Sequence, residues 1–330
     1  GQLSVEGTEE SGCVISSTRD SSFGGTGING EADYWGGLNI NPTGALNALF
    51  THIYFAYDAD TKSVLSDAGV IVLTDSVIHN SLSNCYTIYA NMNGMNNERL
   101  EMIYQAFSSS VSGYNRDRIA IGGSLNNDLS LNSQEYQYVL VNNFSNVAGT
   151  TLNFGPGTNI LGQNGFFDFY GLVQINGEED NRVVFTSIHD VNYGGEGVTE
   201  TSHYWQGMVI NAGASFIAEY MNFFYACNDT HKYGFFTKAN TSIDHSEFKY
   251  SRGGHIYLRS SVKNIVLNVT NSKFSDSITN GILATNMLTE LGSAKLIVRG
   301  CEFVNNLNSG IYTHFVSSIE HVIEDNSFSG

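Results

Sequence analysis

Proline is nearly absent from this chain of 330 residues, in which Pro42 and Pro156 are the only two. Charged residues are also scarce, at 14% of the chain, whereas Gly, Ser, Asn, Thr and Tyr are abundant. A composition poor in helix formers and rich in turn residues is typical of β-structure. We therefore expect an all-β fold in which short strands are joined by polar turns.

Basic residues are few, since 15 Lys and Arg stand against 32 Asp and Glu, which gives a net charge of −17. Nucleic-acid binding draws much of its affinity from neutralised phosphates, so we expect no nucleic-acid partner. An acidic polysaccharide would be repelled unless a cation bridged it to the protein. The sequence also lacks a run of 18 apolar residues, and we expect no membrane insertion.

The few cysteines show no C-x-x-C spacing, which argues against a zinc site. They are Cys13, Cys85, Cys227 and Cys301. In the internal repeat described next, Cys13 corresponds to Val183 and Cys227 to Tyr57. A cysteine that is replaced by Val or Tyr behaves as a core filler. Buried thiols and one or more disulfides both remain open.

The sequence repeats itself. Shifting it by 170 residues aligns residues 1–58 with residues 171–228 without a gap, and 16 of the 58 pairs are identical. Identical pairs include Asp20/Asp190, Gly24/Gly194, Gly25/Gly195, Tyr34/Tyr204 and Trp35/Trp205. We interpret the chain as two tandem copies of a unit of about 167 to 170 residues. The expected boundaries are residues 1–148 and residues 149–330.

A shorter period lies inside each copy. The segments "IDHSEF", "VTNSKF", "VRGCEF" and "IEDNSF" end in Phe248, Phe274, Phe303 and Phe328, which are 26, 29 and 25 residues apart. Ile256, Ile282 and Ile311 each follow such a Phe by eight residues. In the first copy Leu82, Phe107 and Tyr136 stand 25 and 29 residues apart. Like residues at such a period predict solenoid coils that stack like over like.

The segment "NERLEMIYQAF" (residues 97–107) is ambiguous, because Leu100, Ile103 and Tyr104 fall at helical spacing and Asn97 could cap a helix. Its counterpart in the second copy, "NIVLNVTNSKF", is β-branched and alternating. Because two copies should share one backbone, we predict a strand here.

The run "TLNFGPGTNI", "GLVQING", "VVFTS", the doubled glycine, W-x-G-M-x-I and "FIAEYMNFFYA" resembles secreted bacterial proteins with right-handed parallel β-helix repeats. The resemblance covers almost the whole chain and implies a right-handed parallel β-helix, or solenoid, of about 12 coils. It also implies an extracellular or cell-surface location. Such proteins include surface adhesins, stalk modules, and polysaccharide lyases and hydrolases of the pectate-lyase-like superfamily, so the resemblance does not choose a function.

Positions kept in both copies favour a structural role, because an active site is rarely needed twice on one stack. The doubled glycines would then serve a loop that needs positive φ or close backbone approach. The aromatic pairs allow two interpretations: rings that seal a long loop, or a platform on which sugar rings stack. The candidate ligand-binding residues are Tyr34, Trp35, Tyr204 and Trp205.

Carboxylates near these loops could hold Ca²⁺, which prefers six to eight oxygen ligands. The candidates are Asp20, Glu31 and Asp33 in the first copy and Asp190, Glu196 and Glu200 in the second. A solvated acidic loop is the alternative, and we expect no other cofactor.

The resemblance implies two catalytic designs: an acidic calcium cluster with an Arg or Lys base, or paired aspartates. The nearest candidates lie where the copies differ, at Asp244, Arg252 and His255, with His231 and Lys232 earlier in the chain. Arg252 and His255 belong to an expected turn that would let their side chains reach solvent. No tight Asp cluster or Arg-x-Lys pair is present, so we expect no catalytic site.

We therefore expect a non-catalytic extracellular module: a surface stalk, adhesin or filament building block that could recognise glycans through its loops. Its expected partners are copies of itself end to end, adjoining repeats of a longer chain, or a polysaccharide. The alternative is a polysaccharide lyase or glycoside hydrolase on the same scaffold.

Overall fold

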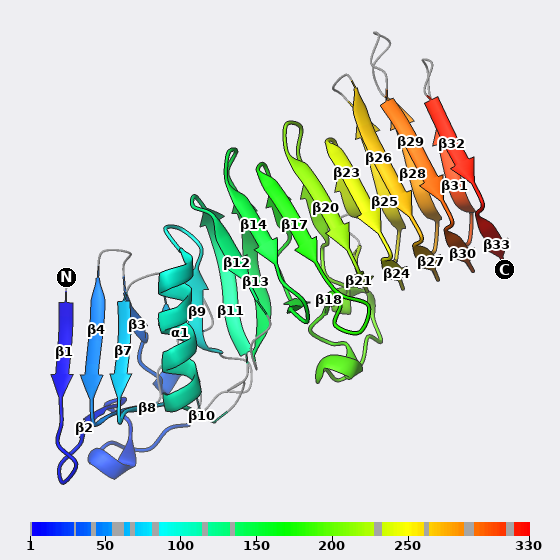
Figure 1. Cartoon of the computed structure of the whole chain (residues 1–330). Helices are drawn as coiled ribbons and strands as arrows, with labels where there is room; N and C mark the ends of the chain where they lie inside the picture. The colour runs from blue at the N-terminus through cyan, green and yellow to red at the C-terminus, as the bar shows by residue number, and fades with distance from the viewer. Residues whose placement is uncertain are drawn as a thin grey trace. The chain divides into compact units, whose positions relative to one another are not determined.

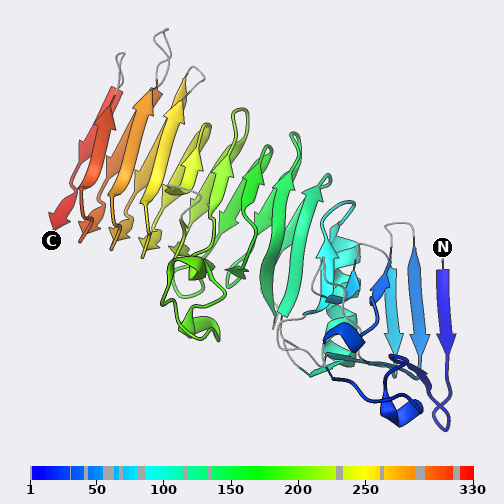
Figure 2. The ribbon, with the colours of Figure 1, turned by 180° about the vertical axis from the view of Figure 1, so that it is seen from behind.

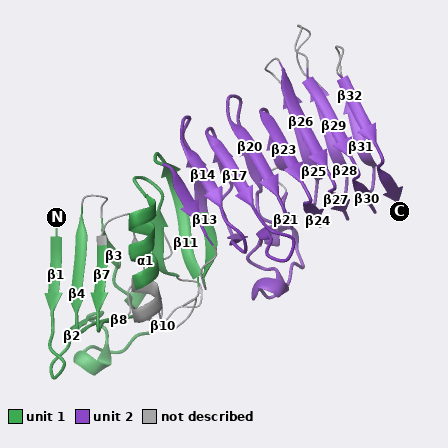
Figure 3. Ribbon diagram, in the orientation of Figure 1, with its two compact units in different colours: residues 1–127, 135–141 green, residues 128–134, 142–330 purple. Residues whose placement is uncertain are grey.

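The computed structural model describes residues 2–29, 31–40, 44–54, 63–66, 70–80, 86–113, 118–132, 136–227, 233–260, 264–286, 294–314 and 320–330. This part of the chain is all-β, with parallel strands and a single α-helix. It forms two compact units, residues 1–127 with 135–141 and residues 128–134 with 142–330 (Figure 3). Among the described residues, no helix has the length and apolar character that crossing a membrane requires.

In the second unit, from β14 onward, each strand pairs in parallel with the strand three places later in the chain. The strands therefore form three ladders (Figure 1; Figure 2 shows them from behind). The first ladder contains β12 (Leu129–Leu131), β14 (Thr151–Phe154), β17 (Leu172–Asn176), β20 (Ser215–Glu219), β23 (Asn240–Asp244), β26 (Ile265–Thr270), β29 (Ala294–Arg299) and β32 (Glu320–Glu324). The second contains β15 (Asn159–Gly162), β18 (Val183–Ser187), β21 (Met221–Phe224), β24 (Glu247–Lys249), β27 (Lys273–Ser275), β30 (Glu302–Val304) and β33 (Ser327–Ser329).

The third ladder contains β16 (Phe167–Phe169), β19 (Met208–Ile210), β22 (Tyr233–Thr237), β25 (Gly254–Ser260), β28 (Asn280–Asn286) and β31 (Ser309–His314). The end of β13 (Gln137–Asn146) pairs with β16. Each turn of the chain therefore adds one strand to each ladder in order. The long parallel sheets wrap nearly closed, which is a solenoid-like arrangement with its core inside.

One residue with a left-handed backbone turns the chain from the first ladder into the second. These corner residues are His245 (φ 46°), Asn271 (φ 47°), Gly300 (φ 60°) and Asp325 (φ 55°). The next residue is polar and points inward in two of these coils: the buried Ser246 hydroxyl donates to the carbonyl of Asp244 (2.8 Å) and accepts the Met221 N–H (3.1 Å). In the segments that end in Phe248 and Phe274, the corner residue and the serine that follows it lie between the inward-facing Ile or Val of the first ladder and the inward-facing Phe of the second. They account for the five-residue spacing between these two apolar side chains.

The core repeats from coil to coil as the sequence predicts. Phe248, Phe274, Phe303 and Phe328 are register partners, and their rings stack at centroid distances of 4.9, 5.1 and 5.1 Å. Ile256, Ile282 and Ile311 are also register partners. Burying each large apolar side chain contributes about 2 kcal/mol, and stacked rings add about 0.5–1.5 kcal/mol. The predicted ladder is confirmed in this unit.

The first unit also has three sets of parallel strands. They are β1 (Gln2–Glu6), β4 (Ala45–Leu49) and β7 (Val70–Thr74); β2 (Cys13–Ile15), β5 (Thr51–Ile53), β8 (Val77–Asn80) and β10 (Val111–Gly113); and β3 (Leu38–Asn39), β6 (Ser63–Ser66), β9 (Tyr86–Asn91) and β11 (Arg118–Leu125). The unit also contains the helix α1 (Asn97–Ser110), which packs beside β7.

The strand predicted over residues 97–107 is wrong, because this segment forms α1. Leu100, Ile103 and Tyr104 are buried on one face, and the Asn96 side chain caps the helix by accepting the Arg99 N–H at 2.9 Å. Helical periodicity and a cap therefore decide the local structure here. In chain order α1 follows β9. At the corresponding place in the coils of the second unit, a strand of the first ladder follows instead. Phe107 accordingly belongs to a helix, and Leu82 lies outside the described residues.

The cysteines are partly accounted for. Cys227 and Cys301 are buried, each with 2% of its surface exposed, whereas Cys13 is partly exposed. Burial raises the pKa of the Cys301 thiol to about 11, which suits a core filler. Cys85 lies outside the described residues.

Candidate functional site

The loop between β18 and β19 is held by Asp190. This residue caps the short 3₁₀ helix η3 (Val191–Tyr193): its carboxylate accepts the Asn192 N–H (3.0 Å) and the Thr186 hydroxyl (2.7 Å). Gly194 closes the turn at φ 82°, a conformation that glycine adopts without strain. Asp190 is only 1% exposed. Its oxygens are therefore engaged by the loop itself.

The loop between β2 and β3 in the first unit has the same geometry. Asp20 caps η1 (Ser21–Phe23) by accepting the Ser22 N–H (2.9 Å) and the Ser16 hydroxyl (2.6 Å), and Gly24 closes it at φ 87°. Hydrogen bonds from Ser16 and Ser22 lower the pKa of Asp20. The residues that the two segments share thus hold the shape of a loop.

Both calcium candidates that recur in the two copies, Asp20 and Asp190, thus use oxygens in hydrogen bonds within their own segments. Asp33 lies 3.7 Å from the Arg19 guanidinium and accepts the Asn29 N–H, while Glu196 is exposed. Across the described ranges, no three His, Cys, Asp or Glu side chains gather as a metal would require. The Glu31 side chain is outside the described part, and calcium binding stays a prediction.

Trp205 is a seal. Only 1% of the side chain is exposed, its Nε1–H donates to the Phe224 carbonyl (2.8 Å), and its ring packs 5.1 Å from that of Phe223. A ring without an exposed face cannot stack on a sugar, which corrects the prediction for Trp205. The half-buried Trp35 makes the equivalent bond to the Tyr54 carbonyl (2.8 Å).

The two tyrosines that precede these tryptophans are more accessible. Tyr34 and Tyr204 are both half-buried. The Tyr204 ring meets Tyr225 edge-on at 5.9 Å, and Tyr225 stacks on Tyr250 at 4.8 Å. Burial raises the pKa of Tyr204, and the charge of Arg252 partly offsets this rise. Sugar stacking at Tyr34, Trp35 and Tyr204 stays a prediction.

Two positions with different contacts in the two loops are Arg19 and Asp33, which correspond to His189 and His203. Arg19 and Asp33 form an ion pair in the first unit, whereas the second unit has His189 and His203, whose rings stack 4.0 Å apart. Burial and the neighbouring His203 lower the pKa of His189. Opposite charges therefore meet at these positions in one unit, and stacked imidazole rings occupy them in the other.

The candidate catalytic residues are not brought together. Asp244 ends β23 in the first ladder, where it accepts the Thr270 hydroxyl (2.6 Å) and lies 2.9 Å from His245. His255 belongs to β25 in the third ladder and is 1% exposed, and its Nε2 lies 2.8 Å from the Ser275 carbonyl oxygen. The expectation that His255 reaches solvent is wrong, because its ring lies among Phe248 and Phe274 in the core. Arg252 is exposed, and His231 and Lys232 lie outside the described residues.

The structure adds a polar hollow of about 300 Å³ on the outer side of the second ladder. Its floor is a column of Asn159, Val184 and Asn222 on β15, β18 and β21. Its walls are the tight turn Glu178–Asn181, with Arg182, and Tyr193 of the capped loop. Sequence analysis missed this hollow, although Arg182, Tyr193 and Asn222 stand opposite Gly12, Phe23 and His52 in the repeat. That difference between the copies was the available signal.

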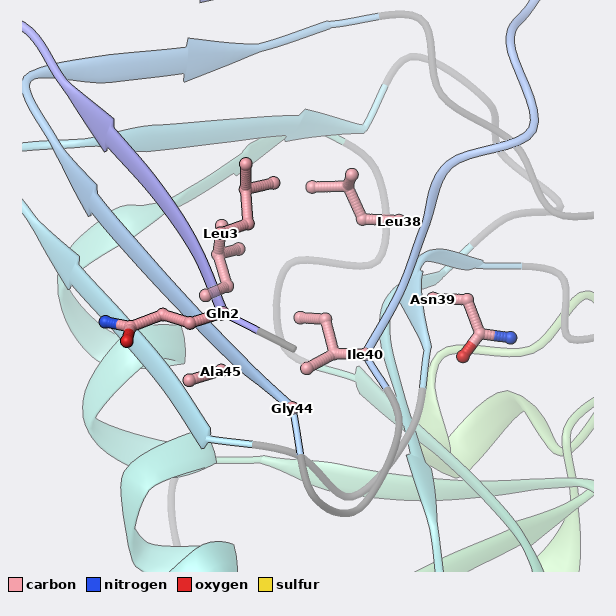
Figure 4. A pocket seen from close by; sticks show the side chains of 8 residues that line it. Gln2, Leu3, Leu38, Asn39, Ile40, Gly44 and Ala45 are labelled. Carbon is pink, nitrogen blue, oxygen red and sulfur yellow. The ribbon is translucent and has the colours of Figure 1, made fainter.

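A second cavity, of about 260 Å³, lies in the first unit against β1, β3 and β4. Leu3, Leu38 and Ile40 face the same space (Figure 4). Leu3 is 44% exposed although its register partner Leu46 is buried. Core positions are therefore uncovered beside β1, the outermost strand of its sheet in the described part of the chain.

Comparisons of the chain with protein-family models, with curated proteins and with solved structures give no match.

Proposed function

We propose that this protein is a non-catalytic extracellular module, a surface stalk or filament building block built as a right-handed parallel β-helix of about 12 coils in two tandem copies. The observation that carries the proposal is the shared use of the repeated residues. Asp20 and Asp190 make the same caps, and Trp35 and Trp205 make the same bonds at 2.8 Å. Residues that occur in both copies stabilise the scaffold, as expected of a module that acts as a stalk or filament.

The dispersal of the candidate catalytic residues supports the same conclusion. General acid–base catalysis needs groups within hydrogen-bond reach of one reacting centre. Asp244 and His255 lie on different ladders, and His255 is enclosed by aromatic rings. A lyase or hydrolase on this scaffold is the alternative that the test below must exclude.

The uncovered core positions support end-to-end association, with copies of the module or with adjoining repeats as the partner. Leu3 is 44% exposed on β1, and Phe328 is 57% exposed on β33, where the stacked phenylalanines end. Edge strands with exposed apolar side chains are templates for further pairing. Another parallel coil would cover both the side chains and the open hydrogen-bonding edge.

The first test measures assembly. Light scattering and negative-stain microscopy of the chain should show end-to-end rods. Leu3→Lys should reduce them, because a charged edge residue opposes strand addition. Val72→Lys is a matched control, since Val72 is also 44% exposed but lies on the outer face of β7. A monodisperse wild-type monomer, or equal effects of the two substitutions, contradicts end-to-end association.

The second test measures chemistry. The protein is incubated with a panel of neutral and acidic polysaccharides, and new reducing or unsaturated ends are measured. The proposal expects none above the level without protein. New polysaccharide ends that form in proportion to protein concentration would contradict the proposal. If Asp244→Asn and His255→Gln do not remove this activity, the protein is an enzyme with a different catalytic centre.

A further inference from the structure

We propose that the hollow between the turn Glu178–Asn181 and Tyr193 is a binding site for a neutral sugar unit. This deepens the proposed function, since it supplies the glycan recognition that a surface module would use. The module's scaffold role does not depend on it. The volume, about 300 Å³, lies at the small end of ligand pockets, which span about 300–1,000 Å³. That size suits one or two sugar rings.

The floor alternates polar and apolar groups. Asn159 pairs with Val184, and Val184 pairs with Asn222, so the two amides lie about 10 Å apart, two strand spacings, with an apolar side chain between them. A pyranose has the complementary pattern, with C–H groups on its face and hydroxyls at its rim. Each amide both donates and accepts, as a hydroxyl does.

Arg182 is held in place at the edge of this floor. Its Nη1 donates to the His245 carbonyl (2.8 Å) and to Asn222 Oδ1 (3.3 Å), and the guanidinium lies over the Tyr220 ring at 5.5 Å. Both hydrogen bonds that Arg182 makes to described residues use Nη1, and a guanidinium has five N–H donors. The fixed group can therefore present its other donors to hydroxyl or ring oxygens without losing further side-chain entropy.

Tyr193 forms the opposite wall. It belongs to the loop that Asp190 caps, so its position is set by the scaffold. Burial and the nearby Asp190 raise the pKa of Tyr193, so the phenol is uncharged at neutral pH. A tyrosine also brings a large apolar ring with a polar tip, which suits an interface between an apolar surface and water.

Charge selects among glycans. The hollow is lined by Glu179, Asp180 and Arg182, which sum to one negative charge, in a chain with a net charge of −17. Uronates, sulfates and phosphates are disfavoured in such a field. The two carboxylates can accept hydrogen bonds from neighbouring hydroxyls, as in a vicinal diol. Both are exposed at the tip of a turn, so they lack the burial that adapts a carboxyl to acid catalysis.

The experiment is calorimetric titration of the full chain with cellohexaose, mannohexaose, laminarihexaose, chitohexaose and hexagalacturonate. At least one neutral hexamer should bind, and hexagalacturonate should bind more weakly or not at all. Asn159→Ala, which removes a side chain that makes no hydrogen bond within the described part of the chain, and Asp180→Asn on the exposed turn should each weaken binding at least about tenfold, equal to about 1.4 kcal/mol. Arg182→Lys should do the same, because lysine lacks the forked donors.

Matched controls lie on the first ladder, away from the hollow. Asn268→Ala on β26 and Arg299→Lys on β29 change the same residue types outside the hollow and should leave binding unchanged. Thermal melting of each variant checks folding, and the exposed Asp180→Asn keeps the test usable if Arg182→Lys destabilises the loop. The proposal is overturned if no neutral hexamer binds at millimolar concentration, if hexagalacturonate binds tightest, or if hollow and control variants behave alike. Rods without sugar binding would refute this site and leave the scaffold function standing.

Discussion

Phe274 and Phe303 are register partners on adjacent strands, and their rings lie 5.1 Å apart with only 10° between their planes. Such parallel stacking follows from the parallel ladder, which places equivalent residues of successive coils at the same position along the strand. Each ring covers the face of the next, and the stability of one coil therefore depends on its neighbours.

Phe303→Ala should lower the free energy of unfolding by about 3–5 kcal/mol, because it removes a buried ring from the middle of the stack. The comparison variant is Phe328→Ala, whose ring is 57% exposed at the end of the stack. That change should cost less than about 1.5 kcal/mol, since little of the ring leaves a dry environment. Reversible denaturant unfolding measures both. A loss below about 1 kcal/mol for Phe303→Ala would contradict the ladder as the source of stability.

Trp205→Ala should destabilise the second unit by about 3–5 kcal/mol, because a fully buried indole and its hydrogen bond to Phe224 are lost. Trp35→Ala should have a smaller effect, since Trp35 is only half-buried. Thermal melting followed by near-ultraviolet circular dichroism reports the difference. Equal losses of stability in the two variants would show that the exposed fraction of the tryptophan ring does not determine its contribution.

Stability should fall as the pH is lowered from 6.5 to about 4, because burial lowers the pKa of His255 to about 4. In this range the unfolded chain, with a histidine pKa of about 6.5, binds a proton that the folded chain does not. Above pH 6.5 His255 contributes no pH dependence, and below about pH 4 the loss levels off. The full loss is about 3 kcal/mol.

His255→Gln should remove most of this dependence, whereas the same change at the exposed His314 should not. Chemical denaturation at a series of pH values gives both slopes. A wild-type stability that is flat between pH 7 and pH 4 would show that His255 gains a proton without cost.

Asn96→Ala should cost about 1 kcal/mol, because the Asn96 side chain caps α1 by accepting the Arg99 N–H. Glu101→Ala on the exposed face of the same helix is the control, and it should change stability by less than about 0.5 kcal/mol. Hydrogen exchange at the first turn of α1 reads the local effect. Protection that is equal in the two variants would exclude Asn96 as the cap.

The sequence predicts the fold best where one residue type recurs at one place in every coil. The stacked phenylalanines and Ile256, Ile282 and Ile311 were found in this way, because an inward position admits few side chains. The helix α1 departs from the predicted strand because the helical spacing of Leu100, Ile103 and Tyr104 decides the local structure, whatever the corresponding segment of the second copy adopts. Local periodicity and the Asn96 cap were the stronger evidence.

The candidate site was harder to predict, because it depends on where turns meet strands. His255 was expected in a solvent-exposed turn, yet it follows Gly253 and Gly254 directly into the core. The hollow joins Asn159 to Asn222, which are 63 residues apart in sequence, through pairings that no local pattern encodes. The signal in the sequence was the difference between the copies at Arg182, Tyr193 and Asn222, which stand opposite Gly12, Phe23 and His52.

The parallel register of the ladders also has a mechanical consequence. In the second unit the strands run across the direction in which coils are added, so the hydrogen bonds between coils point along that direction. A pull along the stack loads these bonds one row at a time, as in opening a zipper, instead of shearing many rows together. Rupture of this unit should therefore proceed in steps of one coil.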